Sequence, residues 1–109
     1  MKRILAPLAG TLLALTPAAF AADGKAIFEA QRCGVCHKED AAAMGPSLQQ
    51  IAEVYAGKKD AMVSLLEGKG DPLMDTGKYE RSMTKPIEKL QPLSAEERDA
   101  LAGYLVEPR

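Results

Sequence analysis

The segment Cys33-Gly34-Val35-Cys36-His37 constrains this chain more than any other. It holds both cysteines and the only histidine among 109 residues. Four kinds of site use a Cys-x-x-Cys arrangement: a zinc site, a redox-active thiol pair, a structural disulfide and a covalent haem attachment. Each kind of site makes different demands on the remaining residues. The rest of the sequence therefore discriminates among the four kinds of site.

Three of the four are disfavoured by the sequence. A closed zinc site needs four protein ligands, and no Cys or His lies outside this segment. A thioredoxin-like thiol pair follows a strand in an α/β fold, whereas the residues before Cys33 have a helical pattern. A disulfide between Cys33 and Cys36 would close a very small loop, and it would therefore restrict the unfolded chain little.

Covalent haem attachment accounts for the spacing. Each cysteine sulfur would form a thioether with one haem vinyl group, and the adjacent His37 would coordinate the iron. The apolar macrocycle would add to the interior of a short chain that has only 5% aromatic residues and no tryptophan. The motif therefore predicts one covalent haem c, with Cys33 and Cys36 as anchors and His37 as an axial ligand.

The first 21 residues have the organisation of an export signal. Two basic residues precede an apolar stretch over residues 4–15, and Ala-Phe-Ala at residues 19–21 fits a signal-peptidase site. The apolar stretch is shorter than the roughly 20 residues of a membrane span. We expect a cleaved signal peptide over residues 1–21 and a mature domain over residues 22–109, located in the bacterial periplasm.

The mature chain would carry a small negative charge. Loss of two basic residues with the signal leaves 12 basic against 15 acidic side chains, a formal charge of −3. This balance gives no electrostatic reason to expect binding to nucleic acid or to an anionic membrane surface.

Three stretches in the first half of the mature chain have the pattern of short helices, and none alternates as a strand would. The first covers residues 24–31, after Asp23 as its N-cap. The second begins after Ser47, which has a glutamine three residues on as its capping-box partner. The third begins after Asp60 as its N-cap and ends at Gly68.

Residues 68–92 show no clear period and contain six glycines and prolines. We expect an irregular loop there, of a length that is usually functional or wrapped around another group. The last helix starts after Ser94, whose capping-box partner is Glu97, and Pro108 marks its end. The predicted fold class is all-α, with three to five short helices.

Nearly all of residues 22–109 resembles a small class I monohaem cytochrome c of the bacterial c551, c552 and c553 group. The resemblance implies N- and C-terminal helices that cross around the covalently bound haem. On that resemblance, Gly24 and Phe28 would meet Leu101, Tyr104 and Leu105. Three segments carry it: GKAIFEAQRCGVCH, GPSLQQIAEVYAG and LSAEERDALAGYLVE.

A methionine is the second axial ligand that the resemblance implies. A second histidine is excluded because His37 is the only one, and a neutral thioether suits an electron carrier since it raises the reduction potential. In the family this methionine precedes the C-terminal helix by a short loop and is often close to a proline. Met83 fits best because Pro86 follows three residues later, and Met74 is the alternative.

The resemblance also implies contacts around the haem. The carbonyl of Pro46 would accept the free ring N–H of His37 and so fix the orientation and tautomer of the ring. Tyr79 and Arg81 are candidates to donate to the haem propionates.

The expected function is one-electron transport by iron that cycles between Fe(II) and Fe(III), without catalysis. We expect a monomer that meets redox proteins in transient encounters, because redox complexes have small interfaces. Two alternatives stay open. One is an electron-entry subunit of a larger periplasmic redox enzyme, and the other is a haem sensor or peroxidase with an open iron site.

Overall fold

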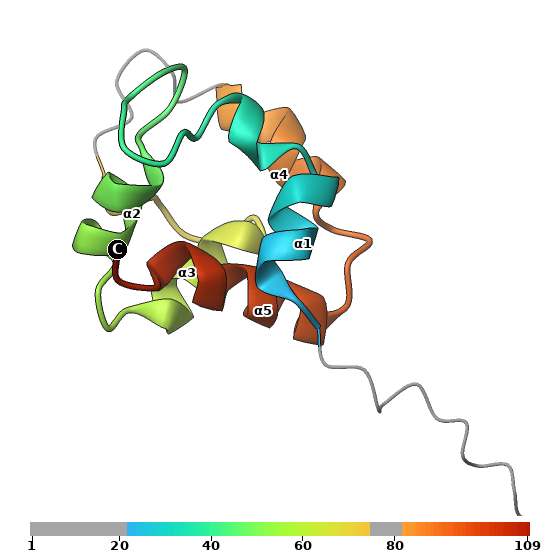
Figure 1. Cartoon of the computed structure of the whole chain (residues 1–109). Helices are drawn as coiled ribbons and strands as arrows, with labels where there is room; N and C mark the ends of the chain where they lie inside the picture. The colour runs from blue at the N-terminus through green and yellow to red at the C-terminus, as the bar shows by residue number, and fades with distance from the viewer. Residues whose placement is uncertain (1–21, 75–81) are drawn as a thin grey trace, which may run out of the picture.

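The computed structural model describes residues 22–74 and 82–109 (Figure 1). No strand occurs within these ranges, so the predicted all-α class is confirmed. The expected signal peptide, residues 1–21, lies outside the described residues. The elements in chain order are α1 (Gly24–Ala30), the 3-10 turn η3 (Cys33–Val35), α2 (Leu48–Val54), α3 (Lys59–Leu66), α4 (Thr84–Lys89) and α5 (Ala95–Val106).

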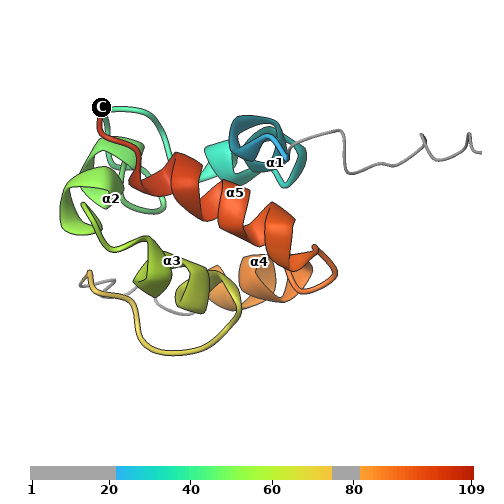
Figure 2. The same cartoon turned by 90° about the horizontal axis from the view of Figure 1, so that it is seen from below.

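Helix α5 is the element on which α1, α2 and α3 pack. Helices α1, α2 and α3 each contact it, and Figure 2 shows α5 running across the centre of the molecule. The helix begins at the predicted capping box, in which Ser94 N donates to Glu97 Oε1 at 2.9 Å and Glu97 N donates to Ser94 Oγ at 3.1 Å. Leu101, Ala102 and Leu105 form its buried face. A well-defined start therefore sets the register of the central helix.

The predicted crossing of the first and last helices is confirmed by the contacts of Gly24. A Cβ at Gly24 would lie 2.8 Å from the Tyr104 Cβ and would collide with the carbonyl oxygen of Ala100. Glycine is therefore required for the two backbones to approach this closely. One turn further on, the rings of Phe28 and Tyr104 have centroids 5.3 Å apart and are tilted by 56°.

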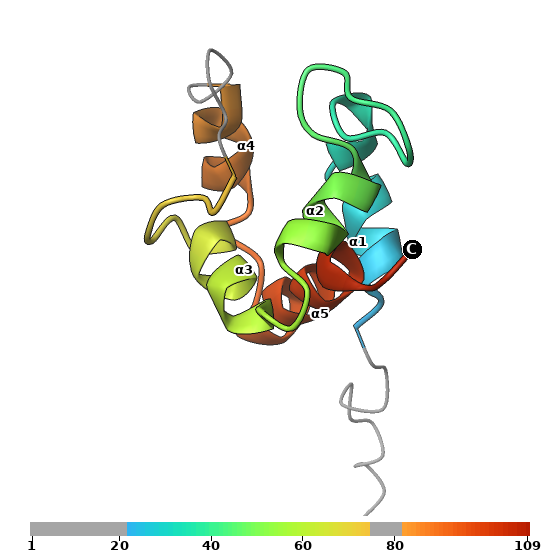
Figure 3. The ribbon, with the colours of Figure 1, turned by 90° about the vertical axis from the view of Figure 1, so that its left-hand side faces the viewer.

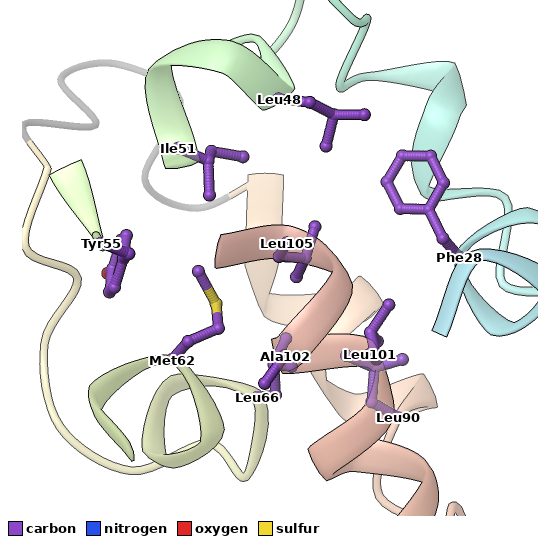
Figure 4. Close-up of a cluster of buried hydrophobic side chains, with 10 residues drawn as sticks. All are labelled: Phe28, Leu48, Ile51, Tyr55, Met62, Leu66, Leu90, Leu101, Ala102 and Leu105. Atoms are coloured by element: carbon purple, nitrogen blue, oxygen red, sulfur yellow. The ribbon is translucent and has the colours of Figure 1, made fainter. Parts of the chain in front are cut away.

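Buried apolar side chains from α1, α2, α3 and α5 form one core with Leu90 (Figure 4). Helix α2 starts at the predicted capping box, in which Gln50 N donates to Ser47 Oγ at 3.1 Å. The hydroxyl of Tyr55, a residue that is only 2% exposed, accepts a hydrogen bond from Leu73 N at 2.9 Å and so ties the chain beyond α3 to the core. The core residues are Phe28, Leu48, Ile51, Tyr55, Met62, Leu66, Leu90, Leu101, Ala102 and Leu105.

The predicted N-cap of the third helix was wrong. Helix α3 starts at Lys59, with Lys58 in the N-cap position and no side-chain cap, so Asp60 lies inside the first turn. A carboxylate there still stabilises the helix, because the unpaired N–H groups of the first turn carry partial positive charge. Asp60 thus favours the start of α3 electrostatically without capping it.

The prediction of an irregular loop over residues 68–92 was wrong for α4. Pro86 is the third residue of this helix, where its missing N–H belongs to a first turn whose amides have no intrahelical partner anyway. The proline therefore does not interrupt the helix. The sequence of α4 shows little apolar periodicity, because few of its residues face the core cluster. Those that do are the half-buried Ile87 and, directly after the helix, the buried Leu90. Figure 3 shows α4 standing apart from α1 and from the loop after η3.

No helix among the described residues is long and apolar enough to cross a membrane.

Candidate haem-binding site

Arg32 turns the chain from α1 into the Cys-x-x-Cys-His segment. Its φ of 61° lies in the left-handed region, which residues other than glycine seldom adopt. In the turn that follows, the carbonyl oxygen of Cys33 accepts from Cys36 N at 3.2 Å and from His37 N at 3.0 Å. One tight turn thus brings both cysteines and the histidine together. The sequence analysis missed Arg32, because its conformation has no signal in the sequence.

Both cysteines are free and half-buried. Burial raises the pKa of the Cys33 thiol; a backbone hydrogen bond opposes the rise, and the nearby Cys36 adds to it. A redox-active thiol pair needs the opposite shift, towards a stabilised thiolate. The raised pKa of Cys33 therefore gives no support to a redox-active thiol pair.

The ring of His37 is oriented by the backbone of a loop nine residues on. Its Nδ1 lies 2.8 Å from the carbonyl oxygen of Pro46. A carbonyl oxygen can only accept, so Nδ1 carries the proton and Nε2 keeps its lone pair for a metal ion. This is the contact that the resemblance implied for Pro46.

The loop between His37 and α2 is closed by backbone hydrogen bonds. Leu48 N donates to Lys38 O at 2.7 Å, and Gln49 N donates to Glu39 O at 3.1 Å. Two of the otherwise unpaired amides at the start of α2 are thereby satisfied. The loop is therefore anchored at both ends to the same helix start.

Gly45 lies against the face of the His37 ring. A Cβ at this position would be 2.6 Å from His37 Cε1 and 3.0 Å from Nδ1. Only glycine lets the backbone come this close, so Gly45 and Pro46 fix the ring together. The sequence analysis predicted the role of Pro46 but missed that of Gly45.

Arg109 connects the same loop to α5. Its Nε lies 2.9 Å from Glu39 Oε2, and its Nη1 donates to the carbonyl oxygens of Tyr104 and Glu107, both at 3.0 Å. The guanidinium also lies 4.7 Å above the centre of the Tyr104 ring. This contact between distant parts of the chain was missed because no local pattern announces it.

The two methionines predicted as second axial ligand both lie among the described residues. Met83 is half-buried and occupies the position directly before α4. Met74 is half-buried and packs against the core cluster. Met62, by contrast, is 3% exposed and belongs to the core. Tyr79 and Arg81, the propionate candidates, lie outside the described residues.

The donor set of this site fits a covalently bound haem. Two free thiols at the right spacing can form thioethers, and one imidazole presents a single nitrogen for iron. Met83, directly before helix α4, supplies a thioether sulfur. The all-helical fold and this site define a c-type haem protein.

Comparison with known proteins agrees with that class. The profile of the family described as "Cytochrome c" matches residues 21–107, and the chain therefore belongs to the cytochrome c family. The cytochrome c-551 of Stutzerimonas stutzeri is 40% identical over 67 residues. That match covers 60% of this chain and spans 64% of the length of the relative. Family membership implies one covalently attached haem c, which Cys33 and Cys36 are placed to hold.

Proposed function

We propose that this chain is an exported monohaem electron carrier with His37 and Met83 as axial ligands. The observation that carries the proposal is the 2.8 Å contact between His37 Nδ1 and Pro46 O, because it leaves Nε2 as the only ring nitrogen that can bind iron. When bound, the haem supplies one-electron chemistry between Fe(II) and Fe(III).

The residues of the chain divide the work of binding. Cys33 and Cys36 hold the macrocycle covalently, and His37 is kept in one orientation by Pro46 and Gly45. Met83 supplies a neutral thioether, which favours the reduced state and raises the potential. With two protein ligands no coordination position is left for a substrate, which supports a carrier and not an enzyme.

The proposal includes export and a short-lived mode of association. Residues 1–21 would be removed before Ala22, and the mature chain would act in the periplasm as a monomer. Small, transient interfaces are typical of redox partners. The N-terminal sequence of the protein purified from the periplasm checks this part, and a chain that keeps residues 1–21 would contradict it.

Absorption spectroscopy tests the ligand assignment. The oxidised protein should show the far-red band of methionine-to-iron charge transfer, and Met83→Ala should lose it. Met74→Ala is the matched control and should keep the band. A band that survives in Met83→Ala but disappears in Met74→Ala would transfer the role to Met74. Haem that is extracted by acidified acetone would contradict covalent attachment.

A further inference from the structure

Helix α4, which Met83 immediately precedes, reaches the core cluster only through Ile87 and, directly after the helix, Leu90. The main helix–helix contacts among the described residues join α1, α2 and α3 to α5, and α4 takes part in none of them. Figure 3 shows the helix rising beside α3 and away from α1. The position of Met83 must therefore depend on how the far end of α4 is held.

The amide of Gln91 holds that far end to α3. Its Nε2 donates to Leu66 O, at the last residue of α3, at 3.1 Å, and to Ile87 O, within α4, at 2.8 Å. The carbonyl groups at the end of a helix have no intrahelical partner, so a side-chain donor there is stabilising. One amide group thus joins the C-terminal ends of α3 and α4.

The guanidinium of Arg98 holds the same end to α5. Its Nη1 donates to the carbonyl oxygens of Leu90, Gln91 and Leu93, at 3.2, 3.0 and 2.7 Å. Arg98 Nε is also buried, and it has no hydrogen-bond partner among the described residues. A charged donor at a helix C-terminus interacts favourably with the partial negative charge of those carbonyls.

We propose that Gln91 and Arg98 are positioning residues that hold Met83 on the iron by fixing the base of α4. This inference rests on the proposed axial role of Met83. Met83 lies seven positions before Leu90, which corresponds to about 10 Å at a helical rise of about 1.5 Å per residue. A tilt of only about 6° at the base would move the start of α4 by about 1 Å, and such displacements matter at a metal–ligand bond. Loss of either residue should therefore weaken the iron–thioether bond without removing any ligand.

Carbon monoxide binding to the reduced holoprotein tests this inference, because carbon monoxide must displace the methionine. We expect Arg98→Leu, which loses hydrogen bonds from a charged group, to bind it with about tenfold higher apparent affinity than the unchanged protein. Gln91→Ala, which loses hydrogen bonds between uncharged groups, should bind it with about fivefold higher apparent affinity. Arg98→Lys, which keeps the charge but not the fork of donors, should be intermediate. Lys59→Leu is the matched control, since it removes an exposed ion pair with Asp99 and should change the affinity less than twofold.

Two further measurements separate the possible failures. If Gln91→Ala and Arg98→Leu lower the urea midpoint of helix unfolding but leave carbon monoxide affinity within twofold, these residues serve the turn alone and the inference is wrong. If Arg98→Leu does not yield folded holoprotein, the carbon monoxide affinities of Arg98→Lys and Gln91→Ala test the inference instead. If Met83→Ala itself does not raise the affinity, the axial assignment fails and the inference fails with it.

Discussion

His37 and Pro46 are joined by a hydrogen bond of 2.8 Å from the ring Nδ1 to the carbonyl oxygen. The bond spans a loop whose two ends are fixed by the first amides of α2, so the acceptor cannot move independently of that helix. Because α2 packs on α5, the orientation of the histidine ring is set by the core of the protein. The hydrogen bond at Nδ1 thus fixes the orientation of the His37 ring before any metal is bound.

Replacement of Gly45 tests how tightly the ring is held. In Gly45→Ala the new Cβ would lie 2.6 Å from His37 Cε1, so the ring or the loop must shift. We expect a loss of about 1–3 kcal/mol in the free energy of unfolding, as overpacking usually gives, because the contact between Gly45 and His37 is partly buried. Urea denaturation of the holoprotein measures it. Ala42→Ser, at an exposed position of the same loop, should change this free energy by less than about 0.5 kcal/mol.

Two helical glycines should respond to the same substitution with opposite sign. Gly24→Ala places a methyl group against α5, 2.8 Å from Tyr104 Cβ, and should destabilise the protein by about 1–3 kcal/mol. Gly103→Ala meets only the end of the Lys59 side chain at 3.9 Å, and alanine favours a helix over glycine. We expect it to stabilise by about 0.5–1 kcal/mol. Thermal unfolding of both variants compares them directly, and equal effects would contradict the crossing contact.

The N-cap of α5 should be worth about 1 kcal/mol. Ser94→Ala removes the oxygen that accepts from Glu97 N and leaves that amide unpaired in the first turn. Ser94→Asp restores an acceptor and also places a negative charge at the helix start, so it should recover the loss. Urea midpoints for the two variants and the unchanged protein form the comparison. A Ser94→Asp variant as unstable as Ser94→Ala would show that the side-chain cap is not what matters.

The ion pair of Lys59 with Asp99 and that of Arg109 with Glu39 should differ in strength. The pair of Lys59 and Asp99 is exposed, with side chains 44% and 58% exposed, and Asp99→Asn should change stability by less than about 0.5 kcal/mol. The side chain of Arg109 is 13% exposed, donates to two carbonyl oxygens and stacks on Tyr104. Arg109→Ala should therefore destabilise by about 1–2 kcal/mol. Urea unfolding in low salt and in about 1 M salt, where the screening length is roughly 3 Å, measures the contribution of each interaction. High salt should weaken the ion pair of Arg109 with Glu39 and leave the contact with the Tyr104 ring.

The sequence predicted the parts of this structure that depend on local patterns. The capping boxes at Ser47 and Ser94 mark two helix starts correctly, because the residues that make each box lie three apart in the chain. The Cys-x-x-Cys-His spacing likewise led to the haem anchors through chemistry that acts over five residues. The sequence predicted correctly those features in which the interacting residues lie close together in the chain.

The features that were missed depend on distant contacts or on weak local signals. Helix α4 is short, contains a proline and has few apolar residues. Its sequence therefore shows no recognisable helical periodicity. The contact of Gly45 with His37 and that of Arg109 with Glu39 arise only once the chain has folded. Gln91 and Arg98 bind backbone carbonyls, and such bonds leave no pattern of paired residue types.

The central place of α5 has a consequence for the order of events during biosynthesis. Since α1, α2 and α3 all pack on this helix, the core cannot close until residues 95–106 have followed the rest of the chain. The Cys33–Val35 turn and His37 precede that helix by more than 50 residues. A growing chain therefore presents its thiols and imidazole while the interior is still open. Contacts between such distant segments form later than local helices, so the two cysteines and the histidine are accessible before the core closes.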